Sequence, residues 1–432
     1  MKYRVPFRIL MLATLYFGVS NLLNLSFPVL VYSDESASKE AFPVRDNPGS
    51  IIASLDQAEK ERDYLFQLPG TSGLMKSWTE WKSGLYEKYG FRFLVELAAL
   101  YQKASSTLGT EDDAAGYDIE FTGTWTFLGK DTPTYSMLGY SVFRKDSLGT
   151  DFTPLTLYTQ YGSLYPGGTA YGEDEWVVGE FWYQQRFQNK FGFRVGYVFP
   201  LTAYDFFPFK NYRTDFVDQN NVANTSIPLP FEGLGGFVMY KPTPQMFFRF
   251  GLHDANADAH KSVSDTYDGE LFSIFEFGMD TNLVPRQKGA PPAGHFHVSA
   301  WHQDPREDLG ISRGAGVTAT LTQRFDRWHP FIRYGYADVD ADGPTFAKQM
   351  AAIGIGIENI FDQTKDRLAV SLSWVEPPDD TLNNQTSIDA YYRLQLTPQI
   401  EFGPTLGIVF DPVSNPEAST VYVGGLRVRI FL

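Results

Sequence analysis

A two-residue alternation of apolar and polar side chains recurs along the chain from Phe91 to its last residue. In residues 367–374 every second residue, beginning at Leu368, is a large apolar one, and the residues between are polar or small. Residues 246–252 and 317–324 repeat the pattern. Successive side chains of a β-strand point to opposite faces, so these segments are predicted strands with one apolar face. Such strands occur both in half-buried antiparallel sheets and in membrane barrels.

Three features favour the barrel. The chain ends on a predicted strand, in residues 422–432. After the N-terminal apolar stretch, it has no window of roughly 18 uninterrupted apolar residues that could form a membrane helix. Tight turns alternate with long polar loops, as in outer-membrane barrels: turns at 189–190, 241–244 and 326–329, loops at 211–229, 253–268 and 376–387. Aromatic residues crowd predicted strand ends, where interfacial girdles lie: Tyr197, Phe199, Tyr204, Phe206, Phe207, Phe209 and Tyr212.

The length fits the same fold. Between Phe91 and Leu432, roughly 340 residues at about 21 per strand and connection give about 16 strands. The sequence therefore predicts an all-β fold, a transmembrane antiparallel β-barrel of about 16 strands over residues 91–432. A soluble sandwich of this size would need two domains, and no linker lies near the middle of the chain.

Composition excludes several classes of function. The chain has 51 acidic and 36 basic side chains, a net charge of −15, which argues against a nucleic-acid partner because phosphate binding needs a basic surface. It has no cysteine, which excludes disulfides, thiolate zinc sites and cysteine nucleophiles. Only 20% of its residues are charged, so something other than water is expected to face much of its surface.

The N-terminus has the features of a secretory signal peptide. A basic start with Lys2 and Arg4 precedes an apolar run over residues 9–19, and Ser33 is a small residue at a cleavage position. Residues 1–33 are therefore a predicted signal peptide, with an N-terminal membrane anchor as the alternative.

Residues 34–90 are predicted to form a periplasmic linker that contains two short helices. Residues 51–66 are rich in helix-forming residues, and residues 74–89 place apolar residues at helical spacing. Trp78 and Trp81 lie in the second helix, and we expect them to pack against the body of the protein.

Several stretches resemble one known family. They are the segment from Gly73-Leu74 to Tyr89-Gly90-Phe91, residues 179–199 (GEFWYQQRFQNKFGFRVGYVF), residues 294–304 (GHFHVSAWHQD) and residues 392–416 (YRLQLTPQIEFGPTLGIVFDPVSNP). In this order they resemble the OprB-type carbohydrate-selective porins, over most of the chain from about Gly73 to Leu432. The resemblance implies a 16-stranded barrel in the bacterial outer membrane that admits monosaccharides and other small carbohydrates by passive diffusion, without a cofactor.

If the apolar face of each strand meets lipid, the opposite face lines the lumen. The residues predicted to bind substrate there are Glu180, Trp182, Arg186, Arg194, Arg249, Glu276, Trp301, Arg324, Arg333, Arg427 and Arg429. The same face carries Gln184, His295, His297, Glu358, Arg367 and Arg393. The two tryptophans are candidate platforms for the apolar face of a sugar ring, and the arginines and glutamates are candidate partners for its hydroxyl groups. The alternative for each is packing or ion pairing that supports the wall. No metal site is predicted.

The predicted partners are small carbohydrates, outer-membrane lipid and lipopolysaccharide, and the barrel assembly machinery, which would recognise the C-terminal strand ending at Leu432. Either a monomer or a trimer is compatible with the sequence. The arginine excess in the predicted lumen supports a general or anion-preferring diffusion porin as the runner-up. An outer-membrane enzyme is a further alternative, which would need a serine or aspartate nucleophile with a nearby base. A secreted lectin-like sandwich is the last.

Overall fold

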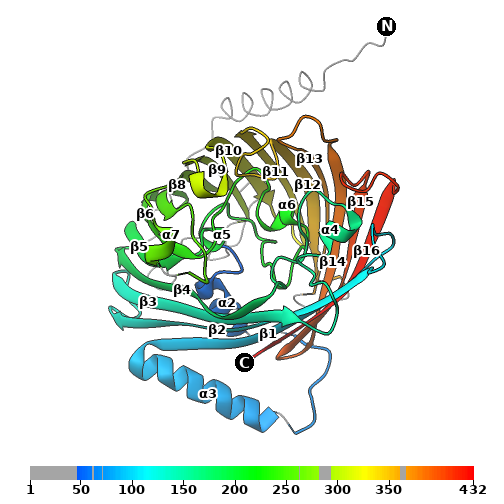
Figure 1. Ribbon diagram of the computed structural model, residues 1–432. Helices are drawn as coiled ribbons and strands as arrows, with labels where there is room; N and C mark the ends of the chain where they lie inside the picture. Colours follow the sequence, from blue (N-terminus) through cyan, green and yellow to red (C-terminus); the bar gives the residue numbers. More distant parts are fainter. Residues whose placement is uncertain (1–45, 61–62, 71, 262, 282–292, 361–365) are drawn as a thin grey trace. The chain divides into compact units, whose positions relative to one another are not determined.

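The computed structural model describes residues 46–432 except 61–62, 71, 262, 282–292 and 361–365 (Figure 1). The predicted signal peptide lies outside the described residues. The helices are α2 (Ile51–Ala58), α3 (Ser72–Tyr89), α4 (Tyr158–Tyr161), α5 (Pro200–Ala203), α6 (Gln219–Val222), α7 (Val263–Thr266) and the 3-10 helix η1 (Glu307–Leu309).

The strands are β1 (Phe91–Ala104), β2 (Asp113–Leu128), β3 (Tyr135–Ser147), β4 (Asp174–Phe187), β5 (Phe191–Val198), β6 (Gly233–Thr243), β7 (Met246–Asp254), β8 (Leu271–Thr281), β9 (Gly294–Gln303), β10 (Gly314–Gln323), β11 (Trp328–Asp338), β12 (Gln349–Glu358), β13 (Arg367–Glu376), β14 (Gln385–Thr397), β15 (Ile400–Phe410) and β16 (Thr420–Phe431).

These strands form a closed barrel in which each is antiparallel to its neighbours in sequence. The seam joins β1 to β16, with Glu96 opposite Phe431 and Ala104 opposite Val423. The last residue, Leu432, also exchanges two backbone hydrogen bonds with Val95. A closed sheet leaves no unpaired edge. The predicted antiparallel barrel of about 16 strands is confirmed.

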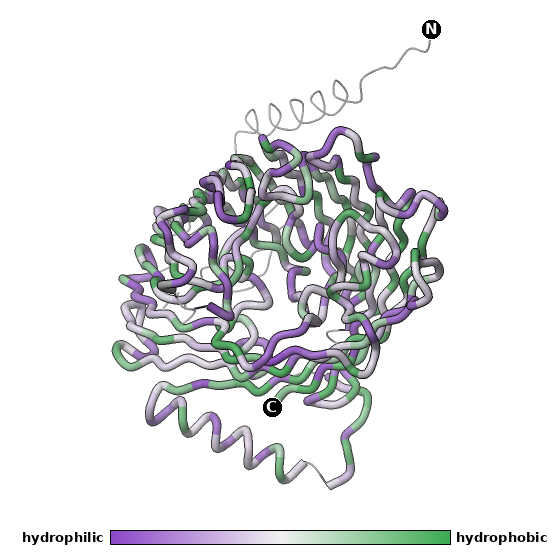
Figure 2. Tube along the Cα trace, in the orientation of Figure 1, coloured by the Kyte–Doolittle hydropathy of each residue, from purple (hydrophilic) through white to green (hydrophobic). Residues whose placement is uncertain are grey.

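The two faces of the wall differ as the alternation predicts. On β16, Tyr422, Leu426 and Val428 are exposed, whereas Arg427 and Arg429 are buried. Figure 2 shows hydrophilic and hydrophobic residues alternating along the wall strands. On this strand the apolar side chains lie outside and the arginines inside, which is the alternation expected of a barrel wall that faces lipid.

The connections at the two ends of the barrel differ in length. One end has tight turns, such as residues 188–190 between β4 and β5 and residues 398–399 between β14 and β15. The other end has long connections, including residues 148–173, 199–232 and 255–270. The predicted asymmetry between short turns and long loops is present.

Helix α2 lies inside the barrel, against the inner face of the wall (Figure 1). Ser50 caps its N-terminus by accepting a hydrogen bond from the backbone N–H of Ala53. Ile51 and Leu55, one turn apart, are buried on a single face of the helix. The helix predicted over residues 51–66 is thus too long. The described residues that follow, 59–60 and 63–66, lie outside any helix, and residues 65 and 66 donate backbone hydrogen bonds to the end of β14.

Helix α3 lies outside the barrel beside β1 (Figure 1). The ring centroids of Trp78 and Trp81 lie 5.8 and 5.7 Å from that of Phe93, on the outer face of β1. The packing expected for these two tryptophans is confirmed. Among the described residues, no helix is long and apolar enough to cross a membrane.

Candidate functional site in the barrel interior

The connection between β5 and β6, residues 199–232, folds into the barrel and is called the inner loop here. Its aromatic residues anchor it. Phe207, Phe209 and Phe216 are completely buried in one cluster with Phe331 of β11 and Tyr391 of β14. Burying each large apolar side chain stabilises the fold by about 1.5–3 kcal/mol. The inner loop is therefore a packed part of the interior.

This position corrects part of the sequence prediction. Tyr204, Phe207 and Phe209 were expected in an interfacial girdle, but they have no exposed surface and lie inside the barrel. An interfacial girdle and a buried aromatic loop are both rich in phenylalanine and tyrosine, so composition does not separate them. Only contacts with strands distant in sequence distinguish the two.

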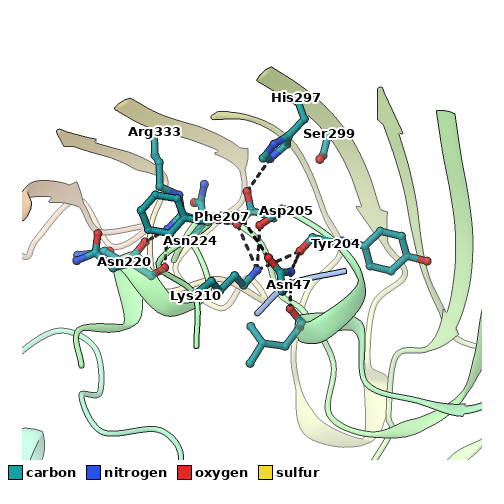
Figure 3. Close-up of polar contacts among 12 residues, drawn as sticks. Asn47, Tyr204, Asp205, Phe207, Lys210, Asn220, Asn224, His297, Ser299 and Arg333 are labelled. Carbon is teal, nitrogen blue, oxygen red and sulfur yellow. Dashed lines mark hydrogen bonds and ion pairs between the residues drawn. The ribbon is translucent and has the colours of Figure 1, made fainter. Parts of the chain in front are cut away.

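Asp205 is the centre of a buried ionic cluster between the inner loop and the wall (Figure 3). Its carboxylate contacts Arg333 of β11, His297 of β9 at 3.1 Å and Lys210 of the inner loop at 3.5 Å. Its backbone N–H donates to a carboxylate oxygen of Glu276 on β8 at 2.8 Å. One residue of the inner loop thus contacts three strands.

The ionic contacts shift the pKa values of this cluster. Burial by itself raises the pKa of the Asp205 carboxyl group, but the positive charges of Arg333 and Lys210 outweigh it and hold that pKa well below its usual value. Burial lowers the pKa of Lys210 to about 8, against the opposing effect of Asp205. Asp205 is therefore ionised at neutral pH, and its charge keeps both cations compatible with a buried position.

A second set of ion pairs holds the middle of the inner loop. Arg213 contacts the carboxylates of Asp118 and Glu120 on β2, at 2.6 and 2.9 Å. Four strands further round the wall, Asp215 contacts Arg393 of β14 at 2.8 Å. Together with the contacts of Asp205 on β8, β9 and β11, these ion pairs tie the inner loop to distant parts of the wall, so the loop narrows the interior.

Strand β16 contributes two of the predicted lumenal arginines. Arg427 donates to the backbone carbonyls of Thr214 and Asp215 in the inner loop. Arg429 contacts Glu96 of β1 at 2.8 Å and Glu401 of β15 at 2.9 Å, which links three wall strands. The first arginine therefore positions the inner loop, and the second supports the seam.

The predicted residues of β4 and β5 form a third cluster. The guanidinium group of Arg194 lies 4.1 Å from the ring centre of Trp182, and it donates to Gln184 at 2.9 Å. The indole N–H of Trp182 donates to Glu180 at 3.1 Å. Arg186 is buried on the same strand as Trp182. An aromatic ring flanked by planar polar groups suits the apolar face and the hydroxyl groups of a sugar, but Arg194 lies over this ring and Trp182 is only 1% exposed.

The other predicted residues divide into three groups. Arg249 and Glu276 lie next to the third cluster, with 4.0 Å between their charged atoms. Trp301 lies in a separate apolar cluster that includes Tyr204. Arg324 is misplaced by the prediction: β10 ends one residue earlier, so its side chain lies 45% exposed at the β10–β11 turn and pairs with Glu358.

Sequence reasoning missed the charged residues of the inner loop, chiefly Asp205, Lys210, Arg213 and Asp215. Their order is ordinary for a polar loop. A possible signal was the spacing of these charges among the aromatic residues of the same segment, because a solvated loop rarely needs so many large rings.

No protein-family model matches the sequence, and no curated protein sequence matches it. Among solved structures, the chain is similar to OprB of Pseudomonas putida in its high-pH structure, with a TM-score of 0.62 and 13% identity over 86% of this chain and 99% of that one. A loop-deletion mutant of OmpT, an outer membrane protein of Vibrio cholerae, gives a TM-score of 0.46 and 10% identity over 79% of this chain and 99% of that one. The chain therefore has the fold of OprB.

Proposed function

We propose that this chain is an outer-membrane porin of the OprB type, which passes small carbohydrates by diffusion. The observation that carries the proposal is the inner loop. It narrows a closed barrel of 16 strands and is held there by buried charged residues, including Asp205 and Arg213. The apolar outer face fits outer-membrane lipid and lipopolysaccharide, and β16, which completes the barrel, fits recognition by the barrel assembly machinery.

The interior offers chemistry that suits sugars. A sugar ring has an apolar face and a rim of hydroxyl groups, so it binds to an aromatic ring flanked by planar polar groups. Trp182, Arg194 and Gln184 provide these groups at one position. Conduction also needs weak binding at several sites, and Arg186 and Arg249 on the inner face of the wall are candidates for further hydroxyl partners.

An anion-preferring diffusion porin is the second candidate. It is favoured by the number of buried arginines on the inner side of the wall: Arg186, Arg194, Arg249, Arg333, Arg427 and Arg429. An outer-membrane enzyme receives less support. A serine hydrolase would need a histidine beside a serine, whereas His253 and His297 contact Tyr204 and Asp205.

Single-channel conductance in planar bilayers tests the proposal, with glucose and longer oligosaccharides titrated from either side. We expect discrete steps that sugar closes in a saturable manner. Arg194→Gln should weaken sugar block several-fold, while the control Arg144→Gln, which alters an exposed arginine paired with Asp146, should leave it unchanged. Steps that ignore sugar, with strong anion selectivity, would favour the second candidate.

A further inference from the structure

Residues 46–58, called the N-terminal segment here, occupy the barrel interior beside the inner loop. Asn47 makes four hydrogen bonds with that loop (Figure 3). Its backbone N–H donates to Thr202, its side-chain amide donates to the carbonyls of Leu201 and Tyr204, and its side-chain oxygen accepts from the N–H of Phe207. These contacts fix the position of the neighbouring Asp46.

Asp46 covers the cluster that is best suited to a sugar. One carboxylate oxygen accepts from Arg194 at 2.7 Å, and the other lies 3.7 Å from Arg249. Arg194 in turn lies on the ring of Trp182. The buried face of α2 belongs to the same apolar cluster as that ring. The N-terminal segment thus places a carboxylate on the arginines and an apolar body at the tryptophan.

The contacts around Arg249 are incomplete. Within the described part of the chain, none of its three guanidinium nitrogens has a hydrogen-bond partner, although the residue is only 1% exposed. One carboxylate oxygen of Glu276 and one of Asp46 are also without a partner. Their distances from Arg249, 4.0 and 3.7 Å, exceed a hydrogen bond. Buried polar atoms in this state favour a ligand whose hydroxyl groups reach them.

Charge defines the ligand further. Arg186 interacts electrostatically with Asp46, Arg194 and Arg249, so three guanidinium groups share this part of the interior. The facing carboxyl groups are those of Asp46, Glu180 and Glu276. Removing the N-terminal segment would take the carboxylate of Asp46 away from Arg194 and Arg249. A solute that replaces it at this position should therefore carry a carboxylate of its own.

We propose that the N-terminal segment is a displaceable plug and that the position it covers, formed by Trp182, Arg194, Arg249 and Glu276 and called the seat here, binds a carbohydrate with a single carboxylate. An aldonic or uronic acid has this chemistry. Its carboxylate replaces that of Asp46, its ring or chain lies on the tryptophan, and its hydroxyl groups reach the unpaired atoms. This inference rests on the proposed porin function and specifies its solute.

The segment is suited to exchange. Helix α2 has eight residues, which is too short to be stable without tertiary contacts. The segment's contacts at the seat, those of Asp46 with Arg194 and Arg249, are ones that a solute carboxylate would reproduce. A segment that competes with the solute lowers the solute's apparent affinity, because the solute can bind only during the fraction of time that the seat is free.

Asp46→Asn tests the proposal, with sodium gluconate and glucose as probes in planar bilayers. Weakening the plug should raise the conductance at least twofold and lower the half-blocking gluconate concentration about tenfold, with a smaller change for glucose. The matched control is Asp56→Asn, which changes a carboxylate of the same segment that pairs with Arg92 away from the seat and is 45% exposed. It should behave like the wild type.

Two further variants separate a plug from a merely structural segment. Leu55→Gln loosens α2 without changing the charges of the seat, so it should raise conductance without changing the ratio of gluconate to glucose block. Adding Arg194→Gln to Asp46→Asn should abolish the preference for gluconate. Heat-dependent gel mobility, a property of folded barrels, confirms that each variant folds.

The outcomes distinguish this inference from the porin proposal. Channels that conduct equally in Asp46→Asn and Asp56→Asn, and that gluconate and glucose block alike, would overturn the plug and its acidic solute while supporting the porin. Correctly folded protein that forms no channels in any variant would overturn the porin proposal itself.

Discussion

Buried charges are the residue-level feature on which the interior of this barrel depends. Asp205, Lys210 and Arg333 are all at most 1% exposed, and they remain charged through mutual contact. Removing one partner of a buried ion pair leaves an uncompensated charge, which costs more than the pair itself contributes. The effect of substitutions here should therefore exceed that of surface ion pairs.

Asp205→Asn should lower the free energy of unfolding by about 3 kcal/mol or more, because Arg333 and Lys210 lose their counterion. Thermal unfolding of the protein in detergent micelles measures the change. The control is Asp304→Asn, since Asp304 pairs with His302 on the surface and both side chains are at least 40% exposed. Equal shifts in the two variants would contradict the role given to Asp205.

Asp218 should make stability depend on pH. It caps α6 and accepts a hydrogen bond from Ser387, and burial raises its pKa to about 6. The carboxyl pKa of an unfolded chain is about 3.9, so the folded protein binds this proton more tightly than the unfolded chain does. The stability that the bound proton adds is therefore lost as the pH rises through about 6. Asp218→Asn removes this loss. The Tm at pH 7, relative to the Tm at pH 5, should therefore be higher in the variant than in the wild type. An unchanged difference would exclude Asp218 as the titrating group.

The strands were predictable because their pattern is local, whereas the contents of the barrel were not. Alternation within about ten residues defines each strand and its two faces, as on β16. The position of the inner loop depends instead on contacts such as Arg213 with Asp118 and Asp205 with Arg333, which join residues far apart in sequence. Arg324 shows a related limit. Alternation predicts which face of the wall Arg324 lies on, but it does not predict that β10 ends at Gln323.

Helix α3 provides a prediction about a single element. Its aromatic residues contact Phe93 on the outside of the barrel, and aromatic pairs of this kind contribute about 0.5–1.5 kcal/mol each. Phe93→Ala should therefore release α3 while the barrel stays folded. The fluorescence of Trp78 and Trp81, read in variants that lack the other tryptophans, should shift to longer wavelength as the rings lose this contact.

The control for this experiment is Phe275→Ala, which removes an exposed phenylalanine of β8 from the outer wall. It should leave the fluorescence of the helix unchanged. A shift of similar size in both variants would show that α3 does not depend on Phe93.

For the whole molecule, the seam between β1 and β16 is the joint that closes the barrel. Glu96 contacts Arg429 across it, and both side chains are 2% exposed. Glu96→Gln should lower the temperature at which the compact barrel form is lost on heat-modifiable gels. Glu80→Gln, in an exposed pair with Lys76 on α3, serves as the control and should leave that temperature unchanged. Similar melting of both variants would show that the seam does not depend on this ion pair.

The seam also sets an order of events during biogenesis. The hydrogen bonds that close the wall join Val95 to Leu432, so more than three hundred residues separate the two partners. The wall closes only when β16 pairs with β1, and a sheet in which these two strands are still apart carries two open edges. The contact that closes the wall therefore has the largest sequence separation of any strand pair, and it should form later in folding than the pairing of strands that are neighbours in sequence.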